Sequence, residues 1–233
     1  MNKPKAIFNW SGGKDSSLAL YRLQQAGEYE ITNLLTTVSG QYRRISMHGV
    51  REELLDRQAE SIGISLHKLI MPDEPSMETY NDLMNETMSH FKKQGNDVSV
   101  FGDIFLEDLR QYREEQLKSA GFKAAFPIWK IPTNQLVEEF LDDGFKGIVV
   151  CVDERHLDKS FVGREMDQSF FRDLPREVDP CGENGEFHSF VYDGPIFSDS
   201  IGVERGEIVY RTYNTPGNPG NKTGFWYCDL IGT

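Results

Sequence analysis

The stretch Ser11-Gly12-Gly13-Lys14-Asp15-Ser16 combines residue types that bind anions. Glycines let backbone N–H groups approach phosphate oxygens, and Lys14 adds a full positive charge. A short apolar run at residues 5–10 precedes the stretch, and leucines at positions 18, 20 and 23 follow it. We expect a strand, a glycine turn and a helix whose N-terminus, capped by Asp15 or Ser16, adds partial positive charge. The arrangement predicts a phosphate-binding loop. The alternative is a plain Gly-Gly turn with a capping aspartate and a solvated lysine.

The spacing within this stretch differs from two common nucleotide-binding motifs. The first glycine of Gly-x-x-x-x-Gly-Lys-Ser/Thr is missing, and Asp15 follows Lys14 where that motif has Ser or Thr. The dinucleotide pattern Gly-x-Gly-x-x-Gly also fails, because Gly12 and Gly13 are adjacent. A nucleotide bound here would need a loop of another class.

A second group of reactive residue types lies at Cys181-Gly182-Glu183-Asn184-Gly185-Glu186, before an alternating strand-like run. The paired carboxylates Glu183 and Glu186 could hold Mg²⁺, orient an amine or accept a proton. The alternative is a hairpin turn with solvated acids. Cys181 could be a nucleophile, although a lone cysteine is more often a small buried hydrophobic residue.

Arg113 falls on the apolar side of a predicted helix at residues 106–120, four residues from Leu109 and from Leu117. Burying an unpaired guanidinium is expensive. The side chain must therefore bind a ligand, pair with a carboxylate or extend to solvent, and the pattern leaves these readings open.

Strands predicted at residues 5–10, 31–38, 65–70 and 98–102 alternate with amphipathic helical patterns. This rhythm predicts an α/β fold with a doubly wound parallel sheet. Ligands of such sheets bind beyond the carboxyl ends of the strands. The polar residues at three of these ends therefore predict one nucleotide crevice, made by Ser11 to Ser16, Ser39-Gly40 and Gly102-Asp103.

The second part of the chain has a different pattern of predicted helices and strands. A helix at 133–141 capped by Thr133 and an apolar strand at 147–152 precede strand-like runs at 186–192, 207–213 and 225–231. Residues 214–221 are dense in turn-forming residues and predict a surface loop. We expect two domains, a nucleotide-binding domain at 1–125 and a smaller α+β substrate-binding domain at 126–233.

Composition limits the classes of protein further. The formal charge of −12, from 37 acidic and 25 basic residues, disfavours general nucleic-acid binding. Three cysteines without a Cys-x-x-Cys pair disfavour a disulfide framework or a zinc ribbon. No run approaches the length of a membrane span or a signal sequence. We expect a cytoplasmic protein, and the sequence does not indicate its oligomeric state.

Three ordered blocks carry a resemblance to a known family. Ser11 to Ser16 resembles the loop of the PP-loop ATP pyrophosphatases, which split ATP into AMP and pyrophosphate. Gly102, Ile104 and Arg113-Glu114-Glu115 resemble a middle block, and Gly182 to Phe187 with the run up to Phe197 resembles a late block, of the diphthine–ammonia ligase family. The resemblance implies a HUP-like PP-loop sheet and a ligase that adenylates a carboxylate, releases pyrophosphate and transfers ammonia.

The resemblance also implies roles for individual residues. Lys14, Arg113, Glu183 and Glu186 would be catalytic, with Arg113 pairing with pyrophosphate or the substrate carboxylate and the two glutamates orienting ammonia, taking its proton or binding a cation. Asp15 would hold Mg²⁺ unless it is only a cap. The residues expected to bind ATP are Ser11, Gly12, Gly13, Lys14, Asp15, Ser16, Ser39, Gly102 and Asp103.

The implied substrate is diphthine on elongation factor 2, whose trimethylammonium group would suit an acidic cleft formed by Glu183, Glu186 and Asp103. Amidation of a small-molecule carboxylate is an alternative, and so is a non-catalytic ATP or AMP sensor. Sulfur transfer to RNA is a further alternative, which the net charge and the missing cysteine pair disfavour.

Overall fold

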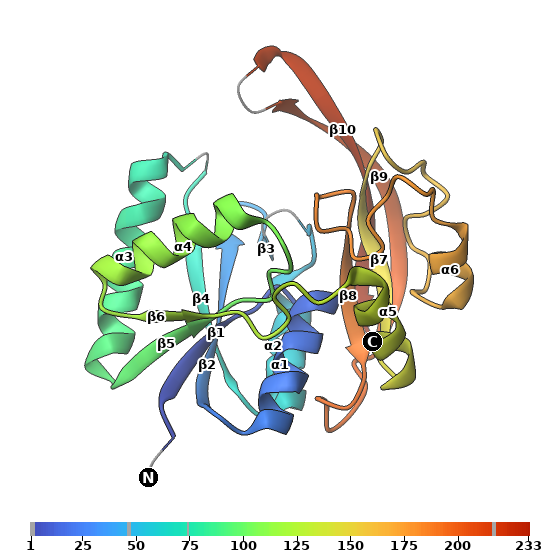
Figure 1. The fold of residues 1–233 in the computed structure, drawn as a ribbon. Helices are drawn as coiled ribbons and strands as arrows, with labels where there is room; N and C mark the ends of the chain where they lie inside the picture. The colour runs from blue at the N-terminus through green and yellow to red at the C-terminus, as the bar shows by residue number, and fades with distance from the viewer. Residues whose placement is uncertain (1–2, 46–47, 74, 216–217) are drawn as a thin grey trace.

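The computed structural model describes residues 3–45, 48–73, 75–215 and 218–233, and places them in two β-sheets with flanking helices (Figure 1). The larger sheet has the order β3-β2-β1-β5-β6, and β4 pairs with β2. Its pairs are parallel except for β2 with β3. The strands of this sheet are β1 (Lys5–Asn9), β2 (Glu30–Ser39), β3 (Arg44–Ile45), β4 (Ser65–Met71), β5 (Asn96–Val100) and β6 (Lys123–Ala125).

Helices cover both faces of the larger sheet because successive side chains of its strands point to opposite faces. Phe8 of β1 packs in the hydrophobic cluster that contains Leu18 of α1. Its neighbour Ile7 packs in the other cluster, with Met88 of α3. The first cluster also contains α2 and the second also contains α4. The helices are α1 (Lys14–Ala26), α2 (Glu52–Ile62), α3 (Met77–Lys93) and α4 (Glu107–Ser119).

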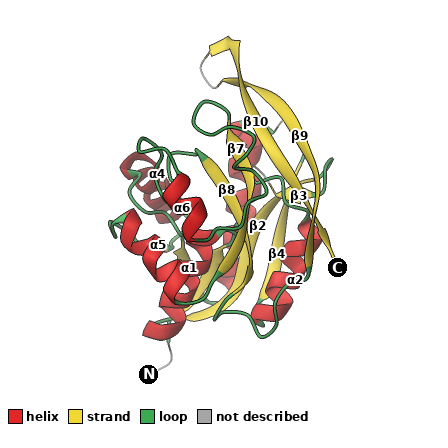
Figure 2. Ribbon diagram, turned by 90° about the vertical axis from the view of Figure 1, so that its right-hand side faces the viewer, coloured by secondary structure: helices red, strands yellow, loops and turns green. Residues whose placement is uncertain are grey.

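The smaller sheet is antiparallel and has the order β8-β7-β10-β9. Phe190 and Val191 of β8 belong to the same hydrophobic cluster as Leu18 of α1, so one core joins the two sheets. The elements of this part are α5 (Thr133–Asp142), β7 (Lys146–Asp153), α6 (Gln168–Asp173), β8 (Phe187–Asp193), β9 (Val203–Thr215) and β10 (Asn218–Gly232). The hairpin of β9 and β10 projects beyond the rest of the molecule (Figures 1 and 2).

The predicted α/β class is confirmed, with a mostly parallel sheet and a separate antiparallel sheet. The predicted helix caps are wrong. Helix α1 begins at Lys14 with Gly13 as its extended N-cap, so Asp15 and Ser16 lie inside the first turn. Helix α5 is preceded by Pro132 as N-cap, and Thr133 is its first residue. Neither cap residue makes a side-chain cap hydrogen bond.

The predicted loop at residues 214–221 is shorter than expected. Asn214 belongs to β9 and pairs with Lys222, and β10 begins at Asn218, because the antiparallel ladder continues into the turn-rich stretch. Pro216 and Gly217 lie outside the described residues. The sequence also gave no sign of β6 and α6, which are too short to show a periodic pattern. The domain division near residue 125 stays a prediction. No helix among the described residues is long and apolar enough to cross a membrane.

Candidate functional site

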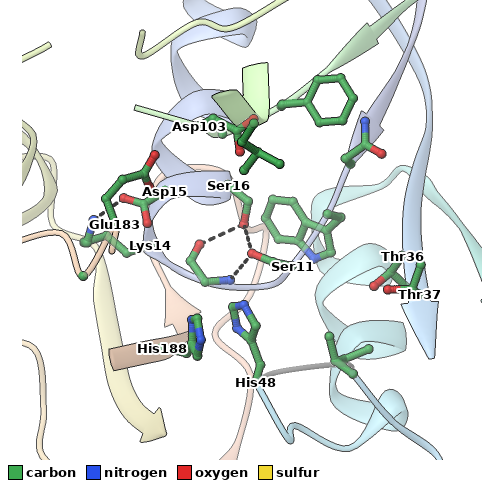
Figure 3. Close-up of a pocket in the computed structure, with 18 of the residues that line it drawn as sticks. Ser11, Lys14, Asp15, Ser16, Thr36, Thr37, His48, Asp103, Glu183 and His188 are labelled. Carbon is green, nitrogen blue, oxygen red and sulfur yellow. Dashed lines mark hydrogen bonds and ion pairs between the residues drawn. The ribbon is translucent and has the colours of Figure 1, made fainter. Parts of the chain in front are cut away.

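A cavity of about 470 Å³ lies at the carboxyl ends of β1 and β5, opposite strand β8 and the loop before it. It is lined from both sheets, so residues far apart in the sequence meet there (Figure 3). Thr36 and Thr37 lie on one side of the loop after β1, and Lys14, Asp15 and Glu183 lie on the other. The predicted residues that line the cavity are Ser11, Gly13, Lys14, Asp15, Ser16, Gly102, Asp103, Arg113 and Glu183.

The loop after β1 has the geometry of an anion site. Gly12 takes the left-handed conformation at φ 77°, which only glycine adopts without strain. The hydroxyls of Ser16 and Ser17 each donate to the carbonyl oxygen of Gly13 at 2.9 Å, which closes the first turn of α1. The N-terminus of α1, with its partial positive charge, lines the cavity.

Lys14 is almost completely buried, at 1% exposure, and forms an ion pair with Asp15. Burial alone would lower the pKa of Lys14, but the Asp15 carboxylate and the Cys181 thiol outweigh it and raise that pKa. The ammonium group therefore stays charged at neutral pH. Lys14 thus places an ammonium group, paired with Asp15, beside the loop.

Strand β8 closes the other side of the loop. The backbone N–H of Lys14 donates to the hydroxyl of Ser189 at 3.0 Å, and the N–H of Val191 donates to the carbonyl oxygen of Gly12 at 2.9 Å. A Cβ atom on Gly13 would lie 3.0 Å from the carbonyl oxygen of Ser189. Gly13 is therefore needed for this close approach between the two sheets.

Arg113 extends from α4 into the cavity and pairs with Asp103, with Nε 3.0 Å from Oδ2. Its guanidinium also stacks on Phe101, 4.3 Å from the ring centroid. Neither Arg113 Nε nor Asp103 Oδ2 has a hydrogen bond of good geometry, although both atoms are buried. Burial raises the pKa of Asp103 despite the opposing charge of Arg113. Asp103 and Phe101 together hold the Arg113 guanidinium at the cavity wall.

Glu183 bridges the late block of the sequence to the end of β5. Its Oε1 accepts hydrogen bonds from the backbone N–H groups of Ile104 at 2.7 Å and Phe105 at 3.4 Å. Burial, with the nearby charges of Asp15 and Asp103, raises the pKa of Glu183 to about 7 in spite of these bonds. A carboxylate with this pKa can exchange a proton near neutral pH.

Three predicted site residues lie outside the cavity lining. Glu186 is 2% exposed and accepts hydrogen bonds from the N–H groups of Asp179 and Asn184, so it shapes the loop that carries Glu183. Gly12 belongs to the loop but faces Gln58 of α2 and not the cavity. Ser39 is the last residue of β2, and its hydroxyl accepts a hydrogen bond from the backbone N–H of Tyr42.

Cys181 lines the cavity next to Lys14, but its thiol is buried. Burial raises the pKa of the Cys181 thiol to about 12, although Lys14 opposes this effect. The thiol donates to the carbonyl oxygen of Thr133 at 3.6 Å. A thiol with this pKa is a poor nucleophile at neutral pH.

Two histidines that were not predicted as site residues also line the cavity. His48 and His188 stack with ring centroids 4.5 Å apart and an interplanar angle of 24° (Figure 3). Burial lowers the pKa of His48 to about 4 and that of His188 to about 3, so both rings are neutral at pH 7. No local pattern of the sequence could have brought His48, which lies before α2, next to His188 of β8.

The chain matches two family models. The diphthamide synthase N-terminal domain matches residues 4–124, and the diphthamide synthase C-terminal domain matches residues 132–216. A diphthine–ammonia ligase of Danio rerio is 24% identical over 230 residues, covering 87% of this chain and 87% of that protein. The Bos taurus protein of the same name is 23% identical over 227 residues, covering 85% of this chain and 82% of that protein.

Among solved structures, the U34-tRNA thiolase NcsA from Methanococcus maripaludis, determined with its [4Fe-4S] cluster, aligns with a TM-score of 0.40 and 15% identity. The alignment covers 60% of this chain and 57% of the thiolase.

Proposed function

The chain belongs to the diphthamide synthase family, and on that premise we propose that it is an ATP-dependent ligase that converts a carboxylate into an amide. Ammonia would be the nitrogen donor, and AMP and pyrophosphate the other products. One observation carries the proposal: the anion-binding loop at the start of α1 faces Arg113, Asp103 and Glu183 across a single cavity. ATP, as the adenylyl donor, and a carboxylate acceptor would therefore meet in one place.

ATP would bind along the loop after β1. The N–H groups at the start of α1 and the Lys14 ammonium would bind the phosphates that leave as pyrophosphate. Ser11, Gly13 and Ser16 line the cavity on this side and would contact the phosphate oxygens. The nucleoside would extend toward the end of β2, where Thr36 and Thr37 line the cavity.

Magnesium would enter with the nucleotide. Among the described residues, no group of three or more His, Cys, Asp or Glu side chains is arranged to hold a metal ion. Mg²⁺ is commonly held by one or two carboxylates together with substrate phosphates and water. Asp15 would supply the protein carboxylate. The ion would neutralise phosphate charge during transfer.

The acceptor carboxylate would bind on the side of Arg113. A guanidinium suits a carboxylate because it can donate two parallel hydrogen bonds. The carboxylate oxygen would attack the α-phosphorus of ATP, and pyrophosphate would leave. The carboxylates of Asp103 and Glu183 beside it would suit an acceptor that carries a positive charge, such as diphthine on elongation factor 2.

Ammonia would then attack the acyl carbon of the adenylate, and AMP would leave. Ammonium predominates near neutral pH, so a base must remove one proton before attack and another must be lost as the amide forms. Glu183 is the cavity carboxylate whose pKa is raised to about 7, which suits it to accept such a proton. Glu186 would act indirectly, by holding the loop that carries Glu183.

The products test this proposal. The protein incubated with MgATP, ammonium and a carboxylate acceptor should release AMP and pyrophosphate in equal amounts. Release of ADP, or no turnover with any acceptor, would count against the ligase, and ATP binding without turnover would favour a sensor. Lys14→Ala should abolish turnover, whereas Lys92→Ala, which removes an exposed ion pair on α3, should not. Circular dichroism would verify that both variants are folded.

The acceptor needs a separate experiment. Deleting the gene in the source organism and measuring the mass of elongation factor 2 would show whether this factor loses an amidated residue. An unchanged mass would remove diphthine as the acceptor and leave a small-molecule carboxylate, which comparison of metabolites between the two strains would reveal.

A further inference from the structure

The buried amide of Gln58 makes three hydrogen bonds beneath the anion-binding loop. Gln58 belongs to α2 and is completely buried. Its Nε2 donates to the carbonyl oxygens of Gly12 at 3.0 Å and Val191 at 2.6 Å, and its Oε1 accepts from the indole N–H of Trp10 at 2.9 Å. Because an indole only donates, Trp10 fixes which end of the amide is the oxygen. Both amide hydrogens are then committed to carbonyl acceptors.

These bonds set the direction of one peptide group. The carbonyl oxygen of Gly12 accepts from Gln58 and also from the backbone N–H of Val191 at 2.9 Å. In a trans peptide the carbonyl and the following N–H point to opposite sides. The N–H of Gly13 is therefore directed away from Gln58. Gly13 lines the cavity and Gly12 does not, so this is the side on which a ligand would bind.

The N–H of Gly13 is only loosely engaged by the protein itself. Its hydrogen bond to Ser11 Oγ is long, at 3.3 Å, whereas the next N–H, that of Lys14, donates to Ser189 at 3.0 Å. A phosphate oxygen in the cavity would thus find the Gly13 N–H available. If the Gly12–Gly13 peptide turned over, a carbonyl oxygen would face the phosphate and repel it.

We infer that Gln58 is a positioning residue that holds the Gly12–Gly13 peptide so that the N–H of Gly13 faces the phosphates of the nucleotide. The inference rests on the proposed function, because it assigns the cavity side of the loop to phosphates. Gln58 touches neither substrate nor reacting atoms. It acts through the carbonyl of Gly12, and Val191 of β8 shares that task.

Binding of inorganic pyrophosphate with Mg²⁺, measured by calorimetry, tests this inference. Gln58→Met keeps the size of the side chain but removes both donors. Asn96→Leu is the matched control, because Asn96 is another buried amide, with hydrogen bonds to Phe91 and Thr32, at the start of β5 and away from the cavity. Both variants should lower thermal stability. Only Gln58→Met should weaken pyrophosphate binding, by about tenfold.

A third variant gives a readout that a purely structural role would not move. In Gln58→Glu an ionised carboxylate would face the two carbonyl oxygens and repel them, whereas the protonated acid could donate to Gly12. The dissociation constant for pyrophosphate should be measured for Gln58→Glu and for the wild type from pH 8 to pH 5. The ratio of the two constants should fall toward one as the pH is lowered. The same ratio for Gln58→Met should stay constant.

The inference would be overturned if Gln58→Met bound pyrophosphate as tightly as the wild type, or if Asn96→Leu weakened binding equally. A ratio for Gln58→Glu that does not change with pH would also overturn it. If Lys14→Ala lost pyrophosphate binding and Gln58→Met kept it, the inference about Gln58 would be refuted. The proposed function would then still stand. A wild-type protein that binds neither pyrophosphate nor ATP would overturn the proposed function, and this inference with it.

Discussion

The Glu183 carboxylate accepts a hydrogen bond at 2.7 Å from the backbone N–H of Ile104, which lies just beyond the end of β5. This bond joins the middle and late sequence blocks at one wall of the cavity. The first block is joined to the late part of the chain in the same way, through the N–H of Lys14 and the hydroxyl of Ser189. The cavity is therefore assembled from both sheets.

Glu183 should make stability depend on pH. Its folded-state pKa is about 7, above its usual value of 4.5, so the folded protein binds more protons than the unfolded chain between these values. The free energy of unfolding should fall as pH rises across that window. Glu183→Gln keeps an oxygen that can accept from Ile104 but does not ionise. The variant should be more stable than the wild type at pH 8 by about 1 to 3 kcal/mol.

Urea unfolding at pH 5 and at pH 8 would measure this difference. The Glu183→Gln variant should also lose turnover, because the amide cannot accept a proton. A variant with the same decline in stability as the wild type would show that Glu183 does not titrate in this range.

Gly12 should tolerate alanine far less well than Gly63, although both have left-handed backbones, at φ 77° and 78°. A Cβ atom on Gly12 would lie 2.6 Å from Oε1 of Gln58, whereas one on Gly63 would meet no atom within 4 Å. Gly63→Ala should cost about 1 to 2 kcal/mol for the backbone alone and leave pyrophosphate binding unchanged. Gly12→Ala should cost more and abolish binding. Equal effects in the two variants would contradict this account.

Asp229 should stabilise the contact between β10 and the segment before α2. It pairs with Arg44 and Arg51, each at 2.7 Å. Burial would raise the pKa of Asp229, but these two arginines outweigh it and hold that pKa at about 2. The two ion pairs should stabilise the folded state above pH 3.8, the usual pKa of an aspartate. This stabilisation should be lost as the pH falls toward 2.

The variant Asp229→Asn should therefore lower the free energy of unfolding at pH 7 by about 1 kcal/mol, a figure reduced for solvent screening. The difference from the wild type should shrink in acid, as thermal melts between pH 7 and pH 2.5 would show. Asp97→Asn, which removes an exposed partner of Lys92, should change little and serves as the control.

Cys181 should be unreactive and dispensable for turnover. The pKa of its thiol is raised to about 12 by burial, so little thiolate exists at pH 8. Iodoacetamide should leave Cys181 unmodified in the folded protein, as peptide mass mapping would show, and modify it in urea. Cys181→Ala should still form AMP. Loss of AMP formation in a folded Cys181→Ala protein would revive a covalent role for the thiol.

The sequence predicted the order of the main elements well because each leaves a local pattern. The run at residues 5–10 and the leucines after it gave β1 and α1, and the glycines between them gave the loop. The predicted caps of α1 were wrong because of interactions within its first turn. Asp15 pairs with Lys14, and Ser16 donates back to Gly13, so both side chains that resembled caps serve the interior of the first turn.

The sequence by itself determined the glycine loop after β1, the α/β class and the family, because these depend on residue types at short spacings. Only the tertiary structure decided which carboxylate faces the cavity. Glu183 and Glu186 are three positions apart and look alike in the sequence, yet Glu183 lines the cavity and Glu186 is buried behind it. The direction of the Gly12–Gly13 peptide is likewise set by Gln58 and Val191. Such relationships depend on how separate elements pack, and no local pattern encodes them.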